Sequence, residues 1–257
     1  MARKIRPVAH DDRLSLVEHL EELRSRLMVA LLAFGIAFAV CFWQDERLIS
    51  FVNKPLPDGN EPLTLSPTEP LLTTMTIAGY GAILIAMPVV LYQIYSFVLP
   101  AFSPTERKVA LPLLLMVPFL FVGGAAFGYF VVMEPALKFL LNFNSSEFQT
   151  EVRARDYYSF VSLSLLSIGI LFQIPVGVLG LTKLGITTPE KLRHNRRYAI
   201  LGCAVLAALL PTIDPVTMLI EMVPLVVLYE VSILLAVAWG RPSTEVAERL
   251  ASAEGSS

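Results

Sequence analysis

Charged residues are scarce in this chain. Asp, Glu, Lys and Arg make up 16% of its 257 residues, whereas the hydrophobic types make up 55%. The charges are also segregated, which leaves long stretches almost free of them and gives a mean hydropathy of +0.64. Because a soluble domain with so few charged groups would lack the polar surface that water requires, this class is excluded. The pattern is typical of an all-α integral membrane protein with several spans.

Cysteine and histidine are rarer still, with two and three copies. Cys41 and Cys203 both fall in apolar runs, so we expect neither a disulfide framework nor a metal site. The sequence contains no H-E-x-x-H, G-x-S-x-G or P-loop motif, and all three histidines lie outside the apolar segments. We therefore expect no enzymatic activity and no cofactor.

What the sequence does contain is a series of six apolar segments, at about 27–43, 71–99, 109–133, 157–181, 198–210 and 216–239. The fifth has 13 residues, which at 1.5 Å per residue reach about 20 Å across a hydrocarbon core about 30 Å thick. The short link "PTIDP" joins it to the sixth as a tight hairpin, which we expect to thin the bilayer locally or to be shielded by other helices. Prolines within the segments would bend the helices, and they are Pro88, Pro112, Pro118, Pro175 and Pro224.

The distribution of positive charge predicts the orientation. Of the 20 Lys and Arg residues, 15 lie in the N-terminal segment, the C-terminal tail and the loops on their side, and five lie in loops on the opposite side. Since positive residues concentrate on the cytoplasmic side, both termini should be cytoplasmic. We expect a cytoplasmic amphipathic segment at 1–26, a six-helix transmembrane domain at 27–239 and a cytoplasmic polar tail at 240–257. The loops at 44–70 and 134–156 would cap the outer face.

The segment before the first apolar run has the pattern of an amphipathic helix. Ser15 and Glu18 form an S-x-x-E capping box, and leucines follow at helical spacing from position 16 to 27. Glu22 can pair with Arg26 one turn later. The structural interpretation is a surface ion pair worth about 0–1 kcal/mol. It leaves open why acids stand at a membrane entrance where basic residues would set the orientation better.

A second acid, Glu106, lies in the loop between the second and third apolar segments. Ser103, Pro104 and Glu106 form another capping box with proline at the first helical position. The fragments "SPTEP" at 66–70 and "TTPEKL" at 187–192 repeat the same arrangement. Helix capping alone therefore explains Glu106 as a structural residue.

Three polar residues fall within the apolar segments. Gln173 lies in the fourth segment, in "GILFQIPVG", and Glu221 and Glu230 lie in the sixth. Carboxylates inside a membrane are costly and usually face a cavity or a partner, although the short fifth segment places Glu221 at shallow depth and Glu230 lies near the inner surface. For Gln173, hydrogen bonding between helices and a functional role are both open.

Several fragments together resemble one family. They are "HLEELRSRL" before the first span, "LYQIYSFVLPAFSPTERK" between the second and third, "FQIP" in the fourth and "GITTPEKLRHNRRYAI" before the fifth. From about Leu16 to Trp239 the chain resembles TatC, the receptor subunit of the twin-arginine protein translocase. The resemblance implies six bent transmembrane helices in a cupped arrangement, with both termini cytoplasmic. It implies the bacterial cytoplasmic (inner) membrane, with a thylakoid or archaeal membrane as the alternative.

The resemblance also implies partners and an energy source. The partners are single-span proteins of the TatA and TatB kind, further copies of the chain, the lipid bilayer, and folded cargo that carries a twin-arginine signal peptide. No nucleic-acid partner is expected. Transport would draw on the proton-motive force. The alternative function is a polytopic ion-coupled small-molecule transporter, which would need internal repeats and central charges that the sequence does not show.

The family's functional positions fall on identifiable residues of this chain. The signal-recognising acids correspond to Glu22 and Glu106, their accompanying positions to Arg24, Arg107 and Phe97, and two further functional positions to Pro55 and Asp214. Two carboxylates can bind two guanidiniums through fork-shaped, charge-assisted hydrogen bonds that lysine does not reproduce. Many members have glutamate where this chain has Gln173, which argues against an obligatory proton carrier there. Gln173, Glu221 and Glu230 are the candidates for polar contacts with a partner inside the membrane.

Overall fold

The computed structural model describes residues 16–57, 61–98, 104–143, 145–147, 150–183, 185–208 and 215–239, and within them the regular elements are helices. The elements are α1 (Leu16–Trp43), α2 (Asp45–Asn53), α3 (Glu69–Val98), α4 (Pro104–Phe127), the π-helical segment η2 (Gly128–Val132), α5 (Met133–Asn142), α6 (Ala154–Leu171), α7 (Ile174–Lys183), α8 (Pro189–His194), α9 (Arg196–Ala208) and α10 (Pro215–Trp239). The predicted amphipathic segment and the first span thus form one continuous helix from Leu16 onward.

Five stretches of the described chain are long and apolar enough to cross a membrane: Leu20–Trp43, Glu69–Phe97, Leu115–Asn142, Ala154–Lys183 and Met218–Ala238. They confirm an all-helical protein with several candidate spans. The fifth predicted span corresponds to α9, whose 13 residues are too few to qualify. Its shortness was expected from the sequence. Because α9 does not qualify as a candidate span, the six-span arrangement stays a prediction.

Two spans differ from the predicted boundaries. The third was expected to end near position 133, but the helix continues through η2 and α5 to Asn142. Pro135 lies within the loop predicted at 134–156, yet it belongs to the first turn of α5, directly after the π turn, where its missing N–H costs no α-helical bond. The fourth span is interrupted at Phe172 and Gln173, because the ring of Pro175 blocks the carbonyl four residues earlier and α6 ends at that residue, Leu171.

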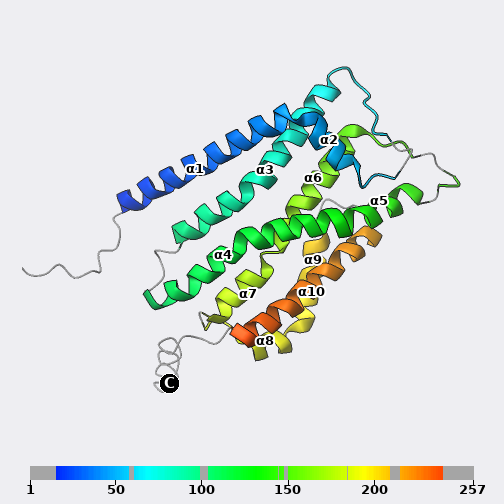
Figure 1. Ribbon diagram of the computed structural model, residues 1–257. Coiled ribbons are helices and arrows are strands. Elements are labelled where there is room, and N and C mark those ends of the chain that lie inside the picture. The colour runs from blue at the N-terminus through cyan, green and yellow to red at the C-terminus, as the bar shows by residue number, and fades with distance from the viewer. Residues whose placement is uncertain are drawn as a thin grey trace, which may run out of the picture.

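Small residues allow the helices to pack closely. α1 lies along α3 (Figure 1), and buried alanines, Ala37 from α1 and Ala82 and Ala86 from α3, form the core of this interface. Where α4 meets α6, a methyl group added at Gly124 would lie 2.6 Å from the side chain of Phe172. Glycine and alanine at such crossings are what membrane helices use to bring their backbones together. On the other side of α4, α10 packs against α7 and α9.

The two long loops meet at one end of the bundle, which we call the loop end and define as residues 44–57, 61–68 and 150–153 with the adjoining helix termini. Tyr129 donates a hydrogen bond to the carbonyl of Phe51 at 2.6 Å, and Tyr157 donates to the carbonyl of Val52 at 2.7 Å. Leu63 forms an isolated parallel bridge with Arg153. The largest buried cluster, built around these tyrosines, lies directly beneath. The described parts of the predicted loops are therefore packed on each other.

The predicted capping boxes are confirmed only in part. α4 begins at Pro104 as expected, whereas its capping residue lies outside the described part of the chain. α8 begins at Pro189, and the Thr188 side chain accepts a hydrogen bond from the Lys191 N–H at 3.3 Å. The box at 66–70 was wrong in register, because α3 begins at Glu69 itself and residues before it form a turn. The Glu69 carboxylate turns back to other partners, described below.

Candidate functional site

Glu22 lies on α1 and pairs with Arg26 one turn later, as predicted. Arg26 donates from Nε to Oε1 of Glu22 at 2.9 Å, and its Nη2 donates to the same oxygen. The side chains are 25% exposed for Glu22 and 23% for Arg26, so the pair is partly withdrawn from solvent. Because these bonds all end on Oε1, the other carboxylate oxygen of Glu22 accepts no bond from the residues that the structure describes.

Arg26 also connects α1 to α3. Its Nη1 donates to Oε1 of Gln93 at 3.2 Å. Sequence reasoning did not select Gln93, and the signal that points to it is its place in the fragment "LYQIYSF". This bond holds the guanidinium of Arg26 between the two helices and thereby orients the carboxylate of Glu22.

Glu106 is the third residue of α4, which begins at Pro104. The side chains of Glu106 and Arg107 lie outside the described part of the chain, so their meeting with Glu22 stays a prediction. Six peptide links connect Val98 to Pro104, and they reach at most about 20 Å. The start of α4 therefore lies near the end of α3, and Figure 1 shows both at the end of the bundle where α1 begins. We call this the Glu22 end.

Two accompanying residues also lie at the Glu22 end. Arg24 is exposed on α1, and Phe97 is partly buried in the last turn of α3. Of the other predicted residues, Pro55 lies in the turn after α2 at the loop end, where it is partly buried, and Asp214 lies outside the described residues. Pro55 is thus far along the bundle from the Glu22 end, because α1 separates the two.

Gln173 stands at the break between α6 and α7. Its Nε2 donates to the carbonyl of Val117 on α4 at 3.3 Å and to the carbonyl of Gly169 at 3.5 Å. Its Oε1 is buried and accepts no hydrogen bond from any described residue. The side chain therefore links two helices of the same chain, as the structural interpretation expected, while its acceptor is left available in the interior.

The two glutamates of α10 have different surroundings. Glu221 is 2% exposed and belongs to the part of α10 that packs on other helices, so it faces protein rather than lipid. Glu230 is partly exposed and forms an ion pair with Arg196 of α9 at 2.8 Å. The pairing agrees with a shallow position for Glu230, because Arg196 is the first residue of its helix.

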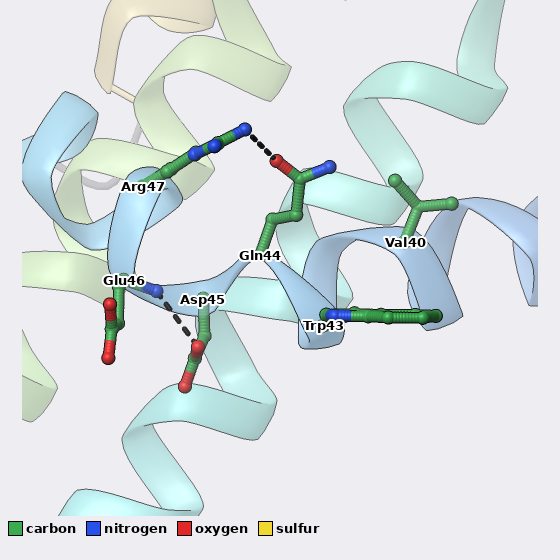
Figure 2. Close-up of a pocket in the computed structure, with 6 residues that line it drawn as sticks. All are labelled: Val40, Trp43, Gln44, Asp45, Glu46 and Arg47. Atoms are coloured by element: carbon green, nitrogen blue, oxygen red, sulfur yellow. Dashed lines mark hydrogen bonds between the residues drawn. The ribbon is translucent and has the colours of Figure 1, made fainter.

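A recess of about 650 Å³ opens at the elbow between α1 and α2 (Figure 2). Arg47 donates to Oε1 of Gln44 at 2.8 Å, and the Glu46 N–H donates to the Asp45 carboxylate at 2.9 Å. Trp43 is 88% exposed at the end of α1, a position typical of an interfacial anchor. This recess lies at the opposite end of α1 from Glu22 and holds none of the predicted site residues.

Comparison with known proteins identifies the family. The family model described as Sec-independent protein translocase protein (TatC) matches residues 18–224. A TatC protein of Aquifex aeolicus is 37% identical over 236 residues, which cover 90% of this chain and 98% of that protein. A chloroplastic TATC of Arabidopsis thaliana is 36% identical over 221 residues, which cover 85% of this chain and 65% of the longer relative.

Solved structures agree with the sequence comparison. A crystal structure described as the twin-arginine translocase receptor TatC in DDM superposes with a TM-score of 0.73 at 37% identity, covering 85% of this chain and 99% of that one. A second crystal structure of the twin-arginine translocase receptor TatC gives a TM-score of 0.72 at 38% identity. The match of the family model over most of the chain, together with these relatives, shows that the chain is a multi-pass membrane protein of protein transport and belongs to the TatC family.

Proposed function

We propose that this chain is the signal-peptide receptor and core subunit of a twin-arginine translocase in a bacterial cytoplasmic membrane. In this proposal six helices cross the membrane, with α9 as the short fifth span, and both termini are cytoplasmic. The Glu22 end then faces the cytoplasm. Single-span proteins of the TatA and TatB kind are its partners, and the proton-motive force drives export of folded cargo.

The carboxylates of Glu22 and Glu106 bind the two consecutive arginines of the signal. Each hydrogen bond to a charged group contributes about 1.5–3 kcal/mol, and a guanidinium offers two parallel donors to one carboxylate. An incoming arginine takes the open oxygen of Glu22 and competes with Arg26 for Oε1. Because Gln93 retains the guanidinium of Arg26 on the α3 side, the displaced charge keeps a partner.

The observation that carries this proposal is the network of Glu22, Arg26 and Gln93. A salt bridge made only for helix stability would need no tie to a second helix. Here the bond runs to α3, which ends at Val98, six residues before α4 begins, and this supports a shared site for Glu22 and Glu106. The match of two crystal structures of twin-arginine translocase receptors supports the same function.

A peptide-binding titration tests the proposal. The full-length protein is reconstituted in bilayers and titrated with a labelled peptide that carries a twin-arginine motif and with its twin-lysine counterpart. Glu22→Gln and Glu106→Gln keep the side-chain shape and should each weaken twin-arginine binding about 10- to 100-fold. Glu46→Gln is the matched control, since Glu46 is an exposed acid at the loop end. Binding should also weaken as salt rises, because the site lies near water.

Two outcomes would reject the receptor site. Unaltered affinity in both glutamine variants would show that these acids do not read the signal. Equal losses in Glu46→Gln and Glu22→Gln would show a general charge effect with no defined site. If Glu106 acts only as a helix cap, Glu106→Gln leaves the affinity unchanged while Glu22→Gln still lowers it.

A further inference from the structure

Two helices begin side by side at the loop end, and a recess lies between their first turns. α3 starts at Glu69 and α6 starts at Ala154, and Arg153 donates from Nε to Oε1 of Glu69 at 2.8 Å. The recess has a volume of about 330 Å³. Its described lining is Ser66, Thr68, Glu69, Leu72, Thr73, Thr76, Arg153 and Arg155. None of these residues belongs to the proposed receptor site.

The recess contains more arginine side chains than ion pairs: Glu69 pairs with Arg153, and Arg155 has no such pair among the described residues. The Glu69 carboxylate is 5% exposed and already engaged, because Oε1 accepts from Arg153 and Oε2 accepts from the Leu65 N–H at 2.8 Å. This carboxylate raises the pKa of Arg153, so the arginine stays charged. Arg155 makes no ion pair or hydrogen bond with the described residues. Among the charged lining residues, one acid and two arginines leave one positive charge, and Asp156, in the first turn of α6, also acts electrostatically on Arg153.

The position of Arg155 has no structural reason in its own helix. It is the second residue of α6, and the partial positive charge of a helix N-terminus disfavours a cation there. The N-terminus of α3 adds a second positive end on the other side of the recess. Two converging helix starts and a guanidinium that forms no ion pair among the described residues together favour an anion between them.

Hydroxyl groups and an apolar rim complete the recess. Thr73 is 6% exposed, and its Oγ1 has no hydrogen-bond partner among the described residues. Leu72, which lines the recess, is 59% exposed, and its neighbours Leu71 and Met75 are exposed as well. These residues lie in the first turns of a candidate membrane span. The recess therefore stands at the boundary between polar loop and apolar helix surface, where lipid headgroups lie.

We propose that this recess binds the phosphate of an anionic phospholipid from the leaflet beside the loop end. Arg155 and the two remaining nitrogens of Arg153 donate to the phosphate oxygens, and the hydroxyls of Ser66 and Thr68 bind the polar headgroup. The acyl chains lie against Leu72 and the exposed apolar face of α3. A free phosphate ion would satisfy the same arginines but would leave this apolar rim without a role.

Native mass spectrometry of the full-length, delipidated protein tests the assignment. The protein is titrated with phosphatidylglycerol and, separately, with phosphatidylcholine, whose choline cancels the charge of its phosphate. We expect preferential binding of phosphatidylglycerol, and Arg155→Gln should lower its affinity about tenfold. Arg47→Gln removes an exposed arginine from the same end of the molecule without touching the recess and should leave the affinity unchanged. Since Arg155 has no bond in the described structure, its replacement should not change thermal unfolding.

Each result decides the matter. A tenfold loss in Arg155→Gln alone supports the lipid site. Equal losses in Arg155→Gln and Arg47→Gln, or equal binding of the two lipids, would show attraction to general surface charge and overturn it. Competition by inorganic phosphate beyond that of chloride at equal ionic strength would reassign the recess to a free anion.

Discussion

Replacing Gln173 by leucine should separate stability from function at the break in the fourth span. Leucine has a similar size and no polar atoms, so Gln173→Leu removes the two hydrogen bonds of Nε2 and also removes the buried Oε1. The bonds to the carbonyls of Val117 and Gly169 are long, at 3.3 and 3.5 Å, and polar bonds between membrane helices average about 0.6 kcal/mol. An unsatisfied buried acceptor costs about 1–3 kcal/mol.

The two contributions therefore nearly cancel or favour leucine. Losing both hydrogen bonds lowers the free energy of unfolding by about 1.2 kcal/mol. Removing the unsatisfied Oε1 raises it by about 1–3 kcal/mol. We expect the free energy of unfolding of Gln173→Leu to be unchanged or to rise by up to about 2 kcal/mol. If the function of the Gln173 amide is to bind a polar group of a partner helix, Gln173→Leu should nevertheless capture less of the single-span partner.

Two measurements on the same preparation check this reasoning. Thermal unfolding in detergent gives the stability, where 1 kcal/mol corresponds to about 2–4 °C for a chain of this size. Co-purification with the single-span partner gives the association, and Gln173→Glu serves as the polar control that should retain it. A drop of the unfolding temperature by more than about 5 °C in Gln173→Leu would refute the cancellation. Unchanged association and transport would refute a partner contact.

Three further predictions concern packing and orientation. Gly124→Ala should destabilise the protein by about 1–3 kcal/mol, because the new methyl group meets the side chain of Phe172 at 2.6 Å; thermal unfolding measures this. Tyr157→Phe should cost about 1–3 kcal/mol, because it leaves a buried carbonyl of α2 without its donor; urea unfolding measures this. Cysteines introduced at Glu147 and Asn195 should react with an impermeant reagent from opposite sides, the first from outside intact cells and the second only after permeabilisation.

Matched variants give each of these predictions a control. Gly177→Ala meets nothing within 4 Å and should not destabilise the helix, so an equal loss in both glycine variants would contradict the packing argument. Tyr92→Phe changes an exposed tyrosine and should leave stability unaltered. Labelling of both introduced cysteines from the same side would contradict the orientation predicted from positive charge.

Hydrophobic runs were enough to predict the five long apolar helical stretches, because a membrane leaves the backbone few other choices. The irregular points were harder to predict. Pro135, just beyond the predicted end of the third span, lies inside a continuing helix, whereas Pro175 does interrupt one. The two prolines carry the same local signal, and only the surrounding turns decide whether the missing donor matters. The start of α3 at Glu69 was missed for a similar reason, since its carboxylate serves the loop end and not a capping box.

The sequence was enough to select candidate site residues, but not to predict the hydrogen bonds that connect them. The pairing of Glu22 with Arg26 follows from helical spacing. The bond from Arg26 to Gln93 does not, because it joins residues that are 67 positions apart and depends on how α1 packs along α3. The same limit applies to the recess beside Arg153, which combines two helix starts from distant parts of the chain.

The contacts of the loop end also determine the order in which it can assemble during translation. The bond between Tyr157 and Val52 joins residues 105 positions apart, so the ribosome needs about 5–20 s at 5–20 residues per second to supply the second partner. During that interval α1, α2 and α3 are already made, while the carbonyl of Val52 at the end of α2 still lacks the hydroxyl that binds it in the folded protein. Each nascent chain therefore passes through a stage in which its first two spans are made while the loop between them still lacks its bond to the fourth span.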